Sequence, residues 1–139
     1  MNARRPVPVP DAASEAYWAA AAEHVLVLAR CRRCGSFALP PDSVCPHCGS
    51  TNPEFEFVPA SGRGTVRSWT TARQSFLPGF DDMLPFVLVD VELVEQAELR
   101  MIGRLLDDVE LDLRIGLPVV ASFEDVAPGV SIPAFGLAP

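Results

Sequence analysis

The sequence contains no lysine, and it is poor in the other side chains that most often carry out acid–base chemistry. All 11 basic residues are arginine, and there are only two histidines and one tyrosine. Without lysine the chain cannot form a Schiff base or a lysine-containing phosphate-binding loop. These absences exclude the lysine-dependent classes of enzyme.

Long hydrophobic runs are also missing. No stretch approaches the ~20 apolar residues that cross a bilayer, and Pro6, Pro8 and Pro10 interrupt the place where a signal peptide would have its apolar core. We therefore expect a cytoplasmic protein without a membrane segment. With 139 residues, of which 49% are hydrophobic and 21% charged, the chain has room for one or two small globular domains.

Charge divides the chain into two unequal parts. Residues 1–50 carry five arginines against four acidic residues, a net charge of +1, whereas residues 51–139 carry six arginines against fourteen acidic residues, a net charge of −8. The first part opens with a proline-rich arm, after which Asp11 is placed to cap a helix beginning at Ala12. A short β-branched run around residues 25–28 then predicts a strand that leads into the cysteines.

The second part has the pattern of a small β-domain. Short apolar runs alternate with turn residues, and each run has the length of a strand. The predicted strands are Phe55–Pro59, Thr65–Ala72, Phe86–Val94, Leu99–Leu106 and Leu117–Phe123. Five short strands suit a closed barrel, because closure removes exposed sheet edges. The apolar end, Val130–Pro139, holds two prolines, so we expect an irregular tail there rather than a central strand.

The four cysteines form the most specific motif of the sequence. There are two C-x-x-C-G knuckles, which begin at Cys31 and Cys45 and contain Cys34 and Cys48, and ten residues lie between the two cysteine pairs. This spacing is typical of a zinc ribbon, in which four thiolates bind one metal ion. Two disulfides, or a redox motif, are the alternatives, but a redox C-x-x-C would occur once and near a βαβ unit. Four thiolates leave no position for water, so we expect one structural zinc per chain.

No arrangement of residues in the sequence is typical of a catalytic site. His24 ends the predicted helix, where the helix dipole favours a positive charge, and His47 is a spacer inside the second knuckle. Tyr17 lies on the apolar face of the helix, and the four thiols are assigned to the metal. We therefore expect no turnover by the isolated chain.

Several segments taken in order resemble an acyl-CoA-associated family in which a zinc ribbon precedes an OB-fold. They are the helix, the two knuckles with Leu39-Pro40-Pro41 between them, Ala60–Val66, Pro85 before a strand that ends Val91-Glu92-Leu93, Ile102–Leu105 and Arg114–Val119. The resemblance covers about residues 12–136. It implies a mainly β protein with an N-terminal arm and helix (residues 1–29), a rubredoxin-like zinc ribbon (30–54) and a five-stranded OB-fold barrel with an apolar tail (55–139).

The resemblance also implies a function. Proteins of this family are non-catalytic partners of thiolase-like enzymes, and some accompany acyltransferases. Others accompany an aldolase that shortens the side chain of a steroid-CoA, and the stretches Ser75–Phe80 and Leu99–Leu105 are most similar to that branch. We therefore expect a hetero-oligomer with such an enzyme, with acyl-CoA at or near the shared interface. By motif position, Cys31, Cys34, Cys45 and Cys48 are the zinc ligands.

Two groups of residues are candidates for contacts with a partner or a ligand. Apolar side chains in segments that we expect to be exposed predict a partner surface; they are Tyr17, Trp18, Phe76, Leu77, Phe80, Ile132 and Phe135. Arginines of the β-domain could bind CoA phosphates, or could pair across strands with acidic neighbours; they are Arg63, Arg67, Arg73 and Arg104. A nucleic-acid-binding module is the competing class, but its charge would have to be positive, so we expect no nucleic-acid partner.

Overall fold

Residues 4–107 and 112–139 are described in the computed structural model, so residues 1–3 of the predicted arm and 108–111 of the predicted β-domain lie outside it. The regular elements of the described part are α1 (Glu15–Ala22), β1 (Val27–Arg30), β2 (Phe37–Ala38), β3 (Glu56–Pro59), β4 (Arg63–Ala72), η1 (Asp81–Met83), β5 (Phe86–Leu93), β6 (Arg100–Leu105), β7 (Pro118–Ala127) and β8 (Val130–Leu137). None of these helices is long and apolar enough to cross a membrane.

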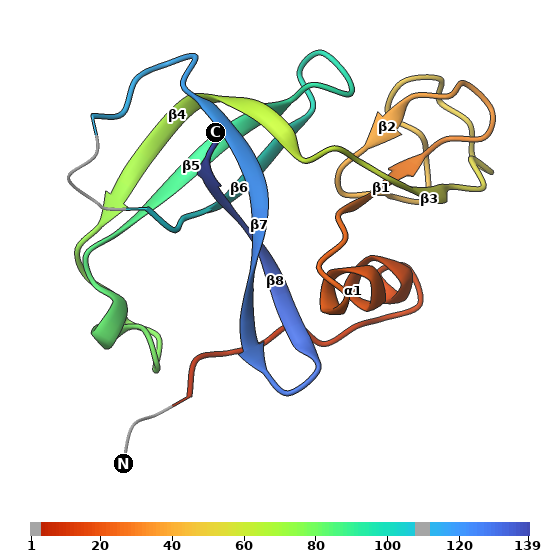
Figure 1. Cartoon of the computed structure of the whole chain (residues 1–139). Coiled ribbons are helices and arrows are strands. Elements are labelled where there is room, and N and C mark those ends of the chain that lie inside the picture. The colour runs from red at the N-terminus through yellow and green to blue at the C-terminus, as the bar shows by residue number, and fades with distance from the viewer. Residues whose placement is uncertain (1–3, 108–111) are drawn as a thin grey trace.

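The strands form two separate sheets, which lie on opposite sides of Figure 1. A three-stranded antiparallel sheet has the order β2-β1-β3, and the other strands close a barrel in the order β4-β5-β6-β8-β7. Helix α1 lies against β8 of the barrel and against β1 of the small sheet. The mainly β fold, with an N-terminal helix and a five-stranded closed barrel, is therefore confirmed.

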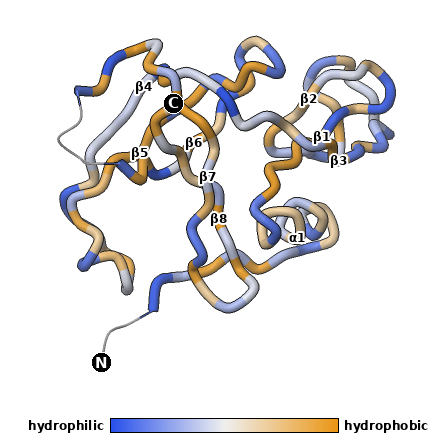
Figure 2. The backbone as a smooth tube through the Cα atoms, viewed as in Figure 1, coloured by the Kyte–Doolittle hydropathy of each residue, from blue (hydrophilic) through white to orange (hydrophobic). Residues whose placement is uncertain are grey.

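Alternation of apolar and polar residues builds the barrel core. In β5 every second residue is buried, and Val87, Val89 and Val91 point inward. The alternation follows from the two-residue period of a strand. Leu26 directly precedes β1 and Leu28 lies within it, and both belong to the same buried cluster as the barrel residues. The core cluster therefore joins the barrel to the segment after α1, which Figure 2 colours as hydrophobic.

The membership of the barrel differs from our expectation at both ends. The run Phe55–Pro59 does form a strand, β3, but it pairs with β1 and completes the small sheet. The fifth barrel strand is β8, formed by the segment that we expected to be an irregular tail, and that expectation is wrong. Pro133 lies opposite Phe123 of β7, and among the described residues β6 meets β8 only at Leu105 and Phe135. The side of β8 that faces away from β7 is therefore unpaired at Pro133, and a residue without a backbone N–H is tolerated there.

The helix begins later than the sequence indicated. Asp11 does not cap it directly; its carboxylate accepts hydrogen bonds from the backbone N–H (2.9 Å) and the hydroxyl (2.7 Å) of Ser14, which is the N-cap residue of α1. These local bonds hold residues 11–14 in a turn, so the regular helix starts at Glu15. The same bonds keep the pKa of Asp11 below its usual range.

Candidate metal centre and partner surface

The fold brings the four cysteines together at one end of the small sheet. All four Sγ atoms lie within 4.8 Å of one another. The Sγ atoms of Cys31 and Cys48 are 3.9 Å apart, and those of Cys34 and Cys45 are 3.8 Å apart. Four sulfurs placed tetrahedrally at ~2.3 Å from zinc are separated by about 3.8 Å. The number, type and proximity of the donors therefore fit a zinc ion.

Each knuckle reaches this geometry by the same local structure. Cys31 donates its backbone N–H to Ser36 (2.8 Å) and accepts the N–H of Gly35 (2.8 Å). The second knuckle repeats the pattern, because Cys45 donates to Ser50 (3.0 Å) and accepts from Gly49 (2.9 Å). Both glycines have positive φ, +78° and +75°, which side chains with a Cβ rarely adopt. The glycine after each cysteine pair therefore permits the turn that gathers the sulfurs.

Backbone N–H groups favour some of the thiolates, but they do not favour all four together. The N–H of Ser36 lowers the pKa of Cys34 to about 6. The N–H of Ser50 also favours the thiolate of Cys48, yet burial and the neighbouring sulfurs outweigh it and raise the pKa of Cys48 to about 11. Sulfurs this close cannot all carry negative charge without a cation. A bound zinc ion supplies that charge and holds the two knuckles together.

Neither histidine lies in the cysteine cluster. The Nε2 atom of His47 is 3.1 Å from the carbonyl oxygen of Phe37, outside the set of sulfur ligands. His24 lies beyond the end of α1 with φ 59°, and its Nε2 is 2.7 Å from Asp125. This turn directs the ring to β7, where it stacks on Phe123, so the contacts with Asp125 and Phe123 rather than the helix dipole explain its position.

The predicted partner residues do not share one environment. Phe76 and Leu77, at the tip of the loop between β4 and β5, are 90% and 58% exposed. Phe80 is half-buried and packs on Phe86, with 6.3 Å between the ring centroids. Phe135 is fully buried in the barrel, because it belongs to β8. Its assignment as an exposed interface anchor is therefore corrected, since a core residue is not available to a partner in this fold.

The other three predicted partner residues are half-buried. Tyr17 and Trp18 pack edge to face, with 4.9 Å between centroids, and Ile132 lies on β8. Burial raises the pKa of Tyr17 to about 12. Tyr17 also packs against the barrel core, so it supports the position of α1.

The candidate CoA-binding arginines fall into two pairs. Arg67 of β4 binds Glu92 of the neighbouring strand β5 (3.0 Å). Arg104 of β6 binds Glu124 of β7 (3.2 Å), which is the next strand but one in the barrel. Arg63 and Arg73 are exposed and have no ion-pair partner within residues 4–107 and 112–139. The cross-strand interpretation therefore accounts for Arg67 and Arg104, and only Arg63 and Arg73 remain available.

An apolar groove of about 550 Å³ was not apparent from the sequence. It lies between α1, the small sheet and β6, and Tyr17, Trp18, Met101 and Ile102 are among its lining residues. Ile102 is 68% exposed although it lies in a strand. The alternation in β6, where Met101 and Gly103 point inward, is the signal that could have placed Ile102 outside.

The fold and the cysteine centre define a protein in which a rubredoxin-like zinc ribbon precedes an OB-fold. Two family models match it: "ChsH2, rubredoxin-like zinc ribbon domain" over residues 18–54 and "ChsH2, C-terminal OB-fold domain" over residues 57–124. The chain therefore belongs to the ChsH2 family, which includes proteins with the DUF35 designation. The prediction of one structural zinc is confirmed by this zinc-ribbon match and by the proximity of the four cysteines.

Two curated relatives are similar over most of this chain. A "Probable enoyl-CoA hydratase alpha subunit" of Thermomonospora curvata is 34% identical over 136 residues, which is 96% of this chain but 40% of that protein. A "DUF35 domain-containing scaffold protein" of Methanocaldococcus jannaschii is 31% identical over 103 residues, 74% of this chain and 70% of that protein. This chain thus spans less than half the length of the Thermomonospora relative.

Two solved structures have the same fold. A chain of the "Ltp2-ChsH2(DUF35) aldolase" is 32% identical, with a TM-score of 0.80, and the match covers 95% of this chain and 99% of that chain. A DUF35 protein of unknown function from Sulfolobus solfataricus matches with a TM-score of 0.58 over 91% of this chain and 86% of that chain. At 16% identity, the second match shows the fold alone.

Proposed function

We propose that this chain is a non-catalytic accessory subunit of a thiolase-like acyl-CoA enzyme, and that the enzyme is an aldolase that cleaves the side chain of a steroid-CoA. The observation that carries the proposal is the similarity to a chain of the Ltp2-ChsH2 aldolase, at 32% identity over 99% of that chain. The name of the Methanocaldococcus relative, a scaffold protein, agrees with a role in assembly rather than in chemistry.

The zinc centre supports a structural rather than a chemical role. Zinc acts as a Lewis acid when one of its positions is open to water or substrate. Here Cys31, Cys34, Cys45 and Cys48 would supply all four ligands of a zinc ion, which would leave no position for water. The metal is then a cross-link that fixes the ribbon, and the reacting groups belong to the partner.

The proposed reaction assigns each chain a part. In a retro-aldol cleavage a base removes the proton of a hydroxyl group, the carbonyl forms as the carbon–carbon bond breaks, and the electron pair passes to the thioester enolate, which is then protonated. The thiolase-like partner supplies the base and the acid. This chain would stabilise the partner and border its acyl-CoA channel, where Arg63 and Arg73 would meet phosphate groups, since both are exposed and have no ion-pair partner among the described residues.

A nucleic-acid-binding function is less well supported by the charges. The compact basic cluster of the sequence is neutralised in the ribbon, because Arg30 binds Glu56 (2.7 Å) and Arg33 lies 3.4 Å from Glu54. Arg32 also reaches Glu56, at 3.6 Å. Phosphate binding requires uncompensated positive charge, and the chain has a net charge of −7.

Co-expression with a tagged thiolase-like protein encoded beside this chain tests the proposal. We expect the two chains to co-purify and to elute together from a sizing column. We also expect the complex, but not this chain by itself, to cleave the side chain of a hydroxylated steroid-CoA. Failure to form a complex would refute the accessory role. A complex that transfers acyl groups but does not cleave the steroid-CoA would refute the aldolase assignment and favour the acyltransferase branch.

A double variant at the loop tip locates the interface. Phe76→Ala with Leu77→Ala removes two exposed apolar side chains and is expected to weaken the complex by about tenfold or more, as exposed anchors of an interface do. Val94→Ala is the matched control, because Val94 is as exposed (57%) as Leu77 (58%) but lies after β5. Equal affinities of the two variants would place the interface elsewhere.

A further inference from the structure

The N-terminal arm is packed against the loop that carries Phe76 and Leu77. At Gly79 of that loop φ is +86°, and a Cβ there would overlap the backbone of Arg5. This close approach places the arm beside η1 although the two segments are far apart in the sequence (Figure 1). Glycine is therefore needed at this position for two reasons, the backbone conformation and the contact with the arm.

The side chain of Arg5 joins three parts of the molecule. It donates to Glu124 of β7 (3.0 Å) and to the sulfur of Met83 in η1 (3.2 Å), and its guanidinium lies 6.0 Å from the ring centroid of Phe80. Both partners of the Arg5–Glu124 ion pair are only 16% exposed. Such a pair is screened less by water and salt than a surface pair.

Glu124 is shared between two arginines. One carboxylate oxygen accepts from Arg5, and the other lies 3.2 Å from Nε of Arg104 on β6. The arm is therefore linked to two barrel strands through a single acidic residue. Because the barrel is the rigid part of the fold, this link fixes the position of the arm relative to the loop.

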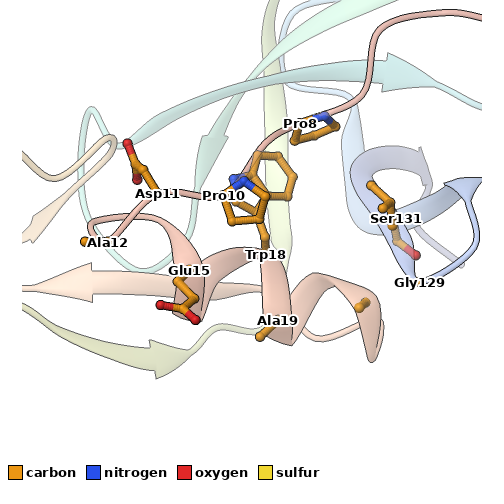
Figure 3. A pocket seen from close by; sticks show the side chains of 11 residues that line it. Pro8, Pro10, Asp11, Ala12, Glu15, Trp18, Ala19, Gly129 and Ser131 are labelled. Carbon is orange, nitrogen blue, oxygen red and sulfur yellow. The ribbon is translucent and has the colours of Figure 1, made fainter.

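Between Arg5 and α1 the arm borders a hollow of the surface. Pro8 and Pro10 line a hollow of about 500 Å³ together with Trp18 of α1 and Ser131 of β8 (Figure 3). Prolines restrict φ, so a segment with prolines at every second position loses little conformational entropy when it docks. The arm is thus linked to the barrel at Arg5, and its prolines then border the same hollow as Trp18.

The base of this loop is packed against the protein, whereas its tip is exposed. Phe80 packs on Phe86, and the Ser75 hydroxyl accepts the N–H of Leu77 (3.2 Å). Phe76 extends from this turn and is 90% exposed. Residues 75–80 contain no charged side chain. The tip is therefore complementary to an uncharged, apolar pocket rather than to a charged surface.

We propose that Arg5 is a positioning residue for partner binding, which clamps the loop through Glu124, Met83 and Phe80. The clamp holds Phe76 and Leu77 in a preorganised loop tip, and this tip enters an apolar pocket of the thiolase-like partner. This inference rests on the proposed function. Ordering the loop before association removes an entropic cost that a mobile loop would bear on binding.

Hydrogen exchange of the isolated zinc-loaded protein tests the clamp without any partner. Arg5→Ala is expected to accelerate exchange in residues 75–83 by about tenfold, because the loop loses contacts on one side, while the zinc content is unchanged. Arg4→Ala is the matched control, since Arg4 is exposed and has no ion-pair partner among the described residues. Unchanged exchange in the Arg5 variant would overturn the clamp.

A double-mutant cycle tests whether the Arg5 clamp acts through the loop tip of Phe76 and Leu77. Arg5→Ala is expected to raise the Kd for the thiolase-like partner by about fivefold to tenfold in the wild-type background, and by less than twofold when Phe76 and Leu77 are already alanine. An equal effect in both backgrounds would overturn the positioning role. If the wild-type chain does not bind the partner at all, both the proposed function and the role of the loop tip fail. If the wild-type chain binds and the Arg5 variant binds equally well, only this inference is refuted.

Discussion

At the scale of the single residue, the cysteines and the core aromatic residue carry the sharpest expectations. The sulfur of Cys48 lies 3.9 Å from that of Cys31, so its loss opens one corner of the tetrahedron. We expect Cys48→Ser to reduce the zinc content from about one ion per chain to well under half, because structural zinc binding and folding of the ribbon are one process. Metal analysis after gel filtration measures this.

His47→Ala is the control for the zinc site. His47 is the neighbour of Cys48 but lies outside the sulfur cluster, and its Nε2 faces the Phe37 carbonyl. This variant should keep its zinc. Equal zinc loss in both variants would show that His47, rather than Cys48 alone, is required at the centre.

Phe135 and Phe76 are the same residue type in opposite environments. Phe135 is 0% exposed and Phe76 is 90% exposed. We expect Phe135→Ala to lower the free energy of unfolding by about 3–5 kcal/mol, because it leaves a cavity in the barrel, and Phe76→Ala to change it by no more than about 0.5 kcal/mol. Denaturant unfolding of the zinc-loaded proteins compares them. A destabilisation of similar size in both variants would contradict the assignment of β8 to the core.

At the scale of the element, the hairpin of β7 and β8 is joined to α1 by one carboxylate. Asp125 accepts a hydrogen bond from the buried hydroxyl of Ser131 (2.5 Å) and lies 2.7 Å from His24. These contacts, with Ser131 the larger contribution, hold the pKa of Asp125 below its usual range. The ionised Asp125 therefore adds a polar contact between the hairpin and the end of the helix, besides the packing of α1 on β8.

The direction of the pH effect follows from that shift. A carboxyl whose pKa is lower in the folded than in the unfolded protein stabilises the fold at neutral pH, and this stabilisation is lost as the pH falls through the folded pKa. Ser131→Ala should therefore lower the midpoint temperature of unfolding at pH 7. The difference in this temperature between the variant and the wild type should become smaller below about pH 4. Thermal unfolding across this range measures it.

Asp125→Asn separates the ionisation from the loss of the Ser131 hydroxyl. In the Asn background no carboxylate titrates at this site, so the effect of Ser131→Ala should no longer depend on pH. A pH-dependent effect that persists there would assign it to another group. Glu92 and Glu56 also have lowered pKa values, caused mainly by the Glu98 backbone N–H and by Arg30 respectively, and they provide the same background in both variants.

At the scale of the whole molecule, the ribbon and the barrel share one buried cluster. Leu26 and Leu28 pack with the barrel valines, and β1, which begins beside them, is the central strand of the small sheet. We expect removal of zinc by a chelator to lower the unfolding temperature of the entire chain by about 10 °C or more, because each kcal/mol lost shifts this temperature by several degrees. The ribbon and the barrel should unfold in one transition.

The two tryptophans allow this coupling to be measured. Trp18 lies on α1 and Trp69 lies on β4 of the barrel. In the variants Trp69→Phe and Trp18→Phe a single tryptophan remains, so fluorescence reports one region at a time. Coincident transitions that move together on chelation are the expected result. A Trp69 transition that ignores the chelator would mean that the barrel is stable without the ribbon.

The sequence by itself determined the parts of this protein that depend on short-range spacing. The C-x-x-C-G repeats predicted the zinc ribbon because each knuckle is built from five consecutive residues, with glycine at the positive φ position. Short apolar runs between turn residues predicted β5 and β6 with nearly their observed bounds. The ordered set of motifs along residues 12–136 indicated the family, since such an order is far more specific than either cysteine pair.

Only the tertiary structure decided which strands close the barrel and which side chains face outward. The strand at residues 56–59 could pair with either sheet, and its register with β1 was fixed by long-range contacts that no local pattern encodes. Pro133 indicated an irregular tail, but the burial of Phe135 outweighs the one hydrogen-bond donor that a proline lacks. The link between Arg5 and Glu124 spans 119 positions, and contacts of that range arise from the packing of the whole chain.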